Sequence, residues 1–218
     1  MAPRSVGIRL ESRMRWLIVL PTLALAGCLG ASRPAPDVAQ FDFGPTASVP
    51  AMTPVFPLRS VDVAAPSWLD SPALQYRLAY AEPARRQSYA ESRWVAPPGE
   101  LLEVALRRAI VSSETSTLTG GCRLLIDLDE LAQVFRTPRD SDGVIEVRAS
   151  LLAPRTDTLL ARKGLSVSRP AASADARGGV AAITAAVEVL VGGLRDWLGA
   201  LDRERAPGLN IAQTCRGP

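Results

Sequence analysis

The sequence predicts an α+β fold: an antiparallel β-sheet with two main helices packed on one face, in a single domain. Two observations lead to this expectation. Several short segments alternate apolar and polar residues, as half-buried strands do, and two longer segments repeat apolar residues at helical spacing. Along the chain the order is three strands, a helix, three strands and a helix, and a sheet covered on one side buries the apolar face of each.

The first half of the domain is expected to hold three strands and one helix. Residues 55–63 are β-rich, with Pro57 marking an edge or a bulge. Residues 74–80 alternate Leu and Tyr with smaller or polar residues, and a strand near 87–93 would complete a hairpin across AEPAR. In residues 97–113, Pro-Pro-Gly is followed by an apolar stripe with Glu early and Arg later, which predicts a helix.

The second half is expected to be an antiparallel meander followed by a helix. Residues 122–136 alternate as a long strand, and DSDG at 140–143 predicts the hairpin turn that follows it. Two further strands, joined across PRTD, complete the meander. Residues 174–203 keep apolar side chains at helical spacing and predict the second helix.

The N-terminus has the order of a secretory signal peptide. Four arginines lie in the first 15 residues, and the next 17 residues, 16–32, carry no charge. Leu25-Ala26-Gly27-Cys28 resembles a bacterial lipobox, the signal for attaching lipid to the cysteine. The resemblance implies removal of residues 1–27, lipidation of Cys28, and, since Leu29 stands where an aspartate would retain the protein at the inner membrane, sorting to the outer membrane. A cysteine inside a transmembrane helix is the alternative, although the uncharged stretch is shorter than the roughly 20 residues that a spanning helix needs.

The mature chain is expected to consist of a tether and one domain. Residues 28–54 contain five prolines among Ala and Ser, a composition typical of a stiff linker. FDFGP, at 41–45, interrupts this segment with two aromatic residues and could dock on the domain as an edge strand. Residues 55–218, about 165 in number, suffice for one domain with a real core.

Composition excludes several classes of function. The formal net charge is +3, but residues 1–27 carry four Arg and one Glu, so 21 basic and 21 acidic residues remain. A near-neutral chain offers no case for nucleic-acid binding. The chain has no histidine, which removes the commonest general base and the commonest metal ligand. We therefore expect no enzyme, no cofactor and no metal, and we expect the acidic cluster of Asp127, Asp129 and Glu130 to lie along a solvated face.

The cysteines leave two alternatives open. If Cys28 carries lipid, Cys122 and Cys215 remain as a pair in an oxidising compartment, where a disulfide could tie the C-terminal tail to the middle of the domain. Two free thiols are the alternative, because spacing in the sequence does not give the geometry of a bond.

Two tryptophan-containing tracts are candidates for contact with a partner. Trp68 and Trp94 both lie in turn-rich segments beside prolines. Each could cap the core, or be an exposed contact of the kind in which tryptophan is enriched. The candidate partner-binding residues are Trp68, Leu69, Asp70, Trp94, Pro97 and Glu100.

The order of the motifs resembles the ABC-type transport auxiliary lipoprotein family. A lipobox comes first, then a proline-flanked aromatic-Leu-Asp motif, then Gln and Arg on the next strand, then an Arg-Trp helix start. The residues are Pro66, Trp68, Leu69, Asp70, Pro72, Gln75, Arg77, Arg93, Trp94, Pro97, Gly99, Glu100, Leu101 and Leu102. The resemblance spans most of the mature chain. Trp68 stands where the family usually has Tyr, and the Cys122 and Cys215 pair is not a general feature of the family.

The resemblance implies a non-catalytic role at the outer membrane. Such lipoproteins work with a periplasmic MCE-domain protein, and indirectly with an inner-membrane permease and its ATPase, to move lipids or other hydrophobic molecules. Family analogy also implies a homo-oligomer. Two alternatives remain: a carrier that itself binds lipid between its sheet and residues 180–201, and a structural envelope lipoprotein with no role in transport.

Overall fold

A computed structural model describes residues 37–44, 56–110, 120–203 and 210–216. Cys28 and the lipobox lie outside the described residues. One compact unit, Asp37–Pro218, contains all of the described residues. This unit therefore begins inside the 28–54 segment that the composition assigns to a tether.

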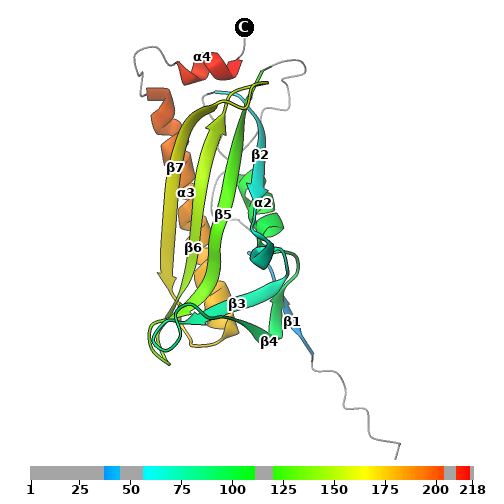
Figure 1. Cartoon of the computed structure of the whole chain (residues 1–218), viewed down its shortest axis with the longest axis vertical. Helices are drawn as coiled ribbons and strands as arrows, with labels where there is room; N and C mark the ends of the chain where they lie inside the picture. The colour runs from blue at the N-terminus through cyan, green and yellow to red at the C-terminus, as the bar shows by residue number, and fades with distance from the viewer. Residues whose placement is uncertain (1–36, 45–55, 111–119, 204–209, 217–218) are drawn as a thin grey trace, which may run out of the picture. The chain divides into compact units, whose positions relative to one another are not determined.

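One seven-stranded sheet organises this unit (Figure 1). Its strands are β1 (Ala39–Phe41), β2 (Leu58–Ala64), β3 (Ala73–Leu78), β4 (Arg86–Trp94), β5 (Cys122–Phe135), β6 (Ser141–Leu152) and β7 (Leu159–Pro170). The helical elements are the 3-10 turn η2 (Ser67–Leu69), α2 (Pro98–Ala109), α3 (Ala176–Arg203) and the short α4 (Ile211–Arg216). The predicted α+β fold with two main helices is confirmed.

The sheet combines antiparallel and parallel pairing. Its strand order is β1-β4-β3-β5-β6-β7, and β2 pairs with the first half of β5, whereas β3 pairs with the end of β5. The β3–β4 hairpin and the β5–β6–β7 meander are antiparallel, as predicted. β1 joins β4, and both β2 and β3 join β5, in parallel register. Parallel neighbours are joined by long connections and are therefore distant in sequence. The alternation of residues within one strand does not indicate which distant strand pairs with it.

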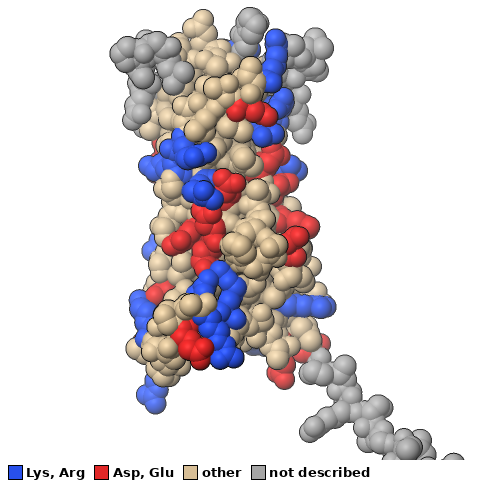
Figure 2. Space-filling model, in the orientation of Figure 1, with Lys and Arg blue, Asp and Glu red and all other residues tan. Residues whose placement is uncertain are grey.

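Both main helices cover the same face of the sheet. α2 contacts β2, α3 contacts β5, β6 and β7, and the two helices contact each other. Their apolar stripes meet the inward side chains of β5, and Leu124, Ile126 and Leu128 are at most 1% exposed. Burial of each such side chain contributes roughly 1.5–3 kcal/mol. The opposite face of the meander is open and carries both acidic and basic side chains (Figure 2).

α3 is the one helix of the described residues that is long and apolar enough, by length and composition, to cross a membrane. The segment Ala176–Leu201 has a mean hydropathy of 1.4, and 56% of its most apolar window is buried inside the domain. A core helix of a globular domain meets the same criteria. Here Val187, Leu190 and Leu194 are buried against the sheet.

The turn between β5 and β6 lies at 136–140, so the prediction of a turn at DSDG, 140–143, is wrong. The N–H groups of Arg136 and Thr137 donate to the Asp140 carbonyl at 2.9 and 3.3 Å. Gly143 instead lies inside β6, where a Cβ would collide with the backbone of α3 at Ala182 and Ile183. Gly143 therefore lets α3 approach β6 closely. The Asp-Gly pair in the sequence is typical of a turn and does not indicate this role.

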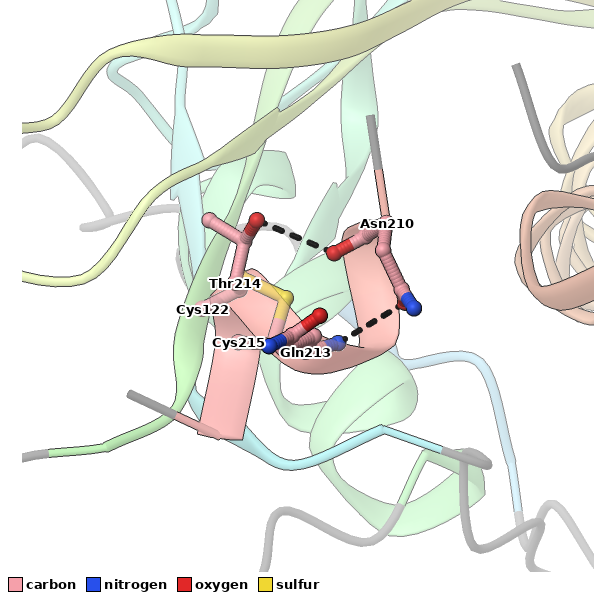
Figure 3. The surroundings of a disulfide bond; sticks show 5 residues. All are labelled: Cys122, Asn210, Gln213, Thr214 and Cys215. Carbon is pink, nitrogen blue, oxygen red and sulfur yellow. Dashed lines mark hydrogen bonds between the residues drawn. A yellow bond between two sulfur atoms is a disulfide. The ribbon is translucent and has the colours of Figure 1, made fainter. Parts of the chain in front are cut away.

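A disulfide joins the start of β5 to the C-terminal helix. Cys122 and Cys215 are bonded, with their Cα atoms 4.9 Å apart, and both residues are fully buried (Figure 3). The N–H of Gly121 also donates to the Cys215 carbonyl at 2.6 Å. Gly121 has φ of +95°, and a Cβ there would lie 2.9 Å from the Arg59 nitrogen, so glycine is required where α4 and β2 meet β5.

Candidate docking surface

Four of the six candidate partner-binding residues lie at the surface. Trp68 and Asp70 are exposed on and beside η2, Glu100 is exposed in the first turn of α2, and Pro97 is half-buried before it. We call these four residues the docking surface. Trp68 is its largest apolar group and is 55% exposed.

Backbone hydrogen bonds within η2 and the buried side chain of Leu69 stabilise the turn that carries Trp68. The N–H of Leu69 donates to the Pro66 carbonyl at 2.8 Å, and that of Asp70 donates to the Ser67 carbonyl at 3.2 Å. Leu69 turns inward and is fully buried. The leucine anchors the turn in the core, so the neighbouring tryptophan projects to solvent.

A polar network fixes the same turn to the sheet. The Gln75 side-chain N–H donates to the Trp68 carbonyl at 2.7 Å, and its Oε1 accepts from Arg86 at 2.8 Å. Arg86 and Arg77 both bind the Glu130 carboxylate, with closest distances of 2.7 and 3.0 Å. All four side chains are largely shielded from water, where charge-assisted bonds are stronger than at the surface.

The first turn of α2 lies against the end of β2. Pro98 occupies the start of the helix, where a missing N–H costs nothing. A Cβ at Gly99 would lie 3.1 Å from the Ala65 Cβ, so glycine lets the helix approach the strand. Glu103 receives the N–H of Val63 at 3.0 Å. The proline-glycine start thus places Glu100 on the same surface as Asp70, the residue after η2.

An open hollow of about 430 Å³ is lined by the start of α2, the end of β2 and Asp70, the residue after η2. Its wall combines apolar residues with three acidic ones, Asp70, Glu100 and Glu103. Arg107 binds Glu103 at 2.9 Å. Among the described residues, Asp70 and Glu100 have no ion-pair partner. The lining residues are Val63, Ala65, Asp70, Pro97, Gly99, Glu100, Glu103 and Val104.

The structure corrects the assignment of Trp94 and Leu69 to a partner surface. Trp94 is 1% exposed and packs edge-on against Phe43, with ring centroids 5.3 Å apart. Leu69 is 0% exposed. Trp94 is a core residue because β1 and the residues after it fold over the end of β4, whereas Leu69 is the buried anchor of its own turn. Proline neighbours make the two tryptophans look alike in sequence, and only the packing separates them.

Arg86 and Glu130 support the docking surface, and the sequence pattern does not identify either residue. The prediction that Glu130 lies with Asp127 and Asp129 along a solvated face is wrong for Glu130. A register shift between Leu128 and Glu130 interrupts the alternation of β5. Glu130 therefore turns toward Arg77 and Arg86, whereas Asp129 binds Arg148 at 2.8 Å. An acidic residue amid alternating apolar ones is the only local signal of such a bulge.

The space between the sheet and α3 is filled by side chains. Ile183, Leu190 and Leu194 are fully buried there. A separate open hollow of about 520 Å³ lies on the outer side of α3, between Ala181–Glu188 and residues 40–44. No group of three potential metal-ligating side chains occurs among the described residues.

Comparison with known proteins identifies crystal structures of similar fold. Protein XCC0632 from Xanthomonas campestris, a DUF330 protein, has a similar crystal structure, with a TM-score of 0.57 and 21% identity over 75% of this chain and 93% of that one. The crystal structure of an uncharacterized protein matches with a TM-score of 0.56 and 11% identity, over 74% of this chain and 98% of that one. At these identities the likeness shows a shared fold. No family model matches the sequence, and no curated protein matches it.

Proposed function

We propose that this chain is an outer-membrane lipoprotein that acts as a non-catalytic docking component of an MCE-type ABC transport system. The observation that carries the proposal is Trp68, a large apolar side chain 55% exposed on a turn that the buried Leu69 and Gln75 hold in place. Tryptophan is enriched among residues that dominate protein–protein binding energy. The motif order in the sequence, from the lipobox to the Arg-Trp helix start, supports the identity of the system.

The docking surface has the features expected of a preorganised contact. Leu69, Gln75 and the Arg86–Glu130 pair hold its turn in place. Binding then costs little ordering of the turn, which favours affinity. The hollow next to Asp70 and Glu100 could receive a side chain of the MCE-domain protein beside the Trp68 contact.

The lipid anchor would keep this surface near the outer membrane. Cys28 and Asp37 are separated by eight residues, and a fully extended chain of this length spans about 30 Å. A lipidated Cys28 would therefore hold the domain within that reach of the membrane, facing the periplasm.

The test is crosslinking and pull-down of the lipidated protein from envelopes, with Trp68→Ala compared with Tyr80→Ala. Tyr80 is a matched control, since it is 47% exposed on the β3–β4 turn and lies outside the docking surface. We expect the wild type and Tyr80→Ala to recover an MCE-domain protein, and Trp68→Ala to recover at least about tenfold less. Trp94→Ala is unsuitable because its side chain is buried.

Two outcomes would overturn the proposal. Equal recovery of the partner by Trp68→Ala and Tyr80→Ala would show that Trp68 is not the contact. Recovery of bound lipid with no protein partner would favour the lipid-carrier alternative.

A further inference from the structure

One long edge of the sheet has no partner strand among the described residues. β7 ends the strand order, and β6 is its only neighbour in the described part of the chain (Figure 1). It runs for 12 residues, more than the five or six of a usual strand. Arg162, Gly164, Ser166 and Ser168 are exposed along it. An edge of this length offers a row of free backbone donors and acceptors.

The hydrogen-bond register shows which residues face outward. The N–H of Ala171 donates to the Ser141 carbonyl at 2.8 Å, and the β6–β7 register is regular from there to Ala161. Bonded and non-bonded pairs alternate in an antiparallel ladder. Odd-numbered residues from 161 to 171 therefore turn their N–H and C=O groups toward β6, and even-numbered residues turn theirs outward. Pro170, which lacks an N–H, occupies an outward position.

The second feature of β7 is its basic charge. Arg162, Lys163 and Arg169 are its charged residues, and β7 contains no acid. None of the three takes part in an ion pair among the described residues. Arg162 only donates to the Ser150 hydroxyl, at 3.2 Å. On the adjacent strand, by contrast, Arg148 is held by Asp129.

The positive charge of β7 indicates which kind of segment can pair with this edge. A second copy pairing β7 against β7 would bring these cations close together, which is unfavourable. An extended segment with carboxylates would meet both the free backbone groups and the unpaired cations. We propose that the outer edge of β7 binds an extended, acidic segment of a partner protein by β-strand addition. This surface lies at the far side of the sheet order from β1 and β4, and it does not depend on the docking surface.

The test uses two synthetic ten-residue peptides, one alternating Thr with Glu and one alternating Thr with Lys. Binding of each fluorescently labelled peptide to the full chain in detergent is measured by anisotropy. We expect the Glu peptide to bind at least about tenfold more tightly than the Lys peptide. Amide exchange should slow at Gly164 and Ser166 when the Glu peptide binds, because their N–H groups face outward.

Matched variants separate strand addition from simple charge attraction. Gly164→Pro removes an outward N–H and leaves the β6 ladder intact, whereas Gly164→Ala keeps the N–H and adds a Cβ with nothing within 4 Å. We expect the proline variant to bind the Glu peptide at least about tenfold more weakly and the alanine variant to bind as the wild type does. Arg162→Glu with Lys163→Glu should reverse the preference between peptides, and Arg139→Glu, on the β5–β6 turn, should not.

Four results would overturn the proposal. They are no binding of the Glu peptide, equal binding of the two peptides, equal binding by the proline and alanine variants, and self-association of the chain that Gly164→Pro abolishes. If Gly164→Pro does not fold, Ser166→Pro makes the same test at the next outward position. No binding of the Glu peptide would mean that the cations only protect the edge from aggregation.

Discussion

Buried polar side chains meet beneath the start of α3. Gln133 is fully buried, accepts the Tyr89 hydroxyl at 2.8 Å and donates to the Ser141 hydroxyl at 2.8 Å. Burial, with smaller effects of nearby groups, raises the pKa of Tyr89 to about 12, so the hydroxyl remains a donor at neutral pH. Gly179 packs directly on the Gln133 carboxamide, and a Cβ there would overlap it.

Gly179→Ala is therefore expected to destabilise the domain, although alanine favours helix. Overpacking and loss of the Gln133 bonds should lower the free energy of unfolding by about 1–3 kcal/mol. Gly199→Ala in the same helix is the control, since its Cβ would meet nothing within 4 Å and the change should stabilise by about 0.5–1 kcal/mol. Urea unfolding followed by circular dichroism measures both, and equal effects would contradict this account of Gly179.

Asp175 caps the first turn of α3 with its carboxylate. The N–H of Gly178 donates to it at 2.8 Å, as does the Ser173 hydroxyl. These bonds lower the pKa of Asp175, that of Gly178 most strongly. Because folding lowers this pKa, the carboxylate stabilises the fold above its unfolded pKa of about 3.9, and the contribution is lost as pH falls through the folded pKa.

Asp175→Ala should accordingly cost more at neutral than at acid pH. We expect a loss of about 1 kcal/mol at neutral pH and a narrowing difference from the wild type as pH falls below about 4. Urea unfolding across this range measures the effect. Asp196→Ala, at an exposed position of the same helix, should change stability by less than about 0.5 kcal/mol. A pH-independent effect of Asp175→Ala would show that the carboxylate charge does not contribute.

At the scale of the elements, periodicity predicted most strands and both main helices. The 97–113 helix is observed as α2, the 122–136 strand as β5 and the 174–203 helix as α3. Each of these segments buries one face, so its apolar residues recur at the period of a helix or a strand. Prediction failed at Gly143 and Glu130. Gly143 accommodates the backbone of α3, and Glu130 follows a register shift in the pairing of β5 with β6.

The disulfide between β5 and α4 is expected to stabilise the fold. It closes a loop of 93 residues between β5 and α4, and a crosslink over such a loop contributes about 2–5 kcal/mol. Cys215→Ser should lower the urea midpoint accordingly, and a reductant should lower the wild-type midpoint without affecting the variant. Thiol alkylation of the unfolded chain, with and without prior reduction, supplies the control. An unchanged midpoint would contradict a stabilising role.

At the scale of the whole molecule, the sheet separates two candidate interaction regions. The docking surface lies by β2, η2 and α2, whereas the basic edge lies along β7. The core between them is continuous and filled. A partner at one region therefore leaves the other free, and the two proposals can fail independently.

Anchoring is also a property of the whole molecule. Cys28→Ser should remove the chain from the outer-membrane fraction, because the lipid is the expected anchor there. Fractionation followed by mass spectrometry of the N-terminal peptide makes the measurement. Persistence of the variant in the outer-membrane fraction, with its signal peptide removed, would contradict lipid anchoring.

Sequence alone determined the α+β class, the order of most elements, the lipobox resemblance and the candidate tracts around the tryptophans. Tertiary structure alone decided that Trp68 is exposed and Trp94 buried, that β2 and β3 join β5 in parallel, and that Glu130 holds Arg86. The physical reason is range. Periodicity, capping and turn chemistry act between residues close in sequence, whereas burial and strand pairing depend on which distant segment arrives to cover a given side chain.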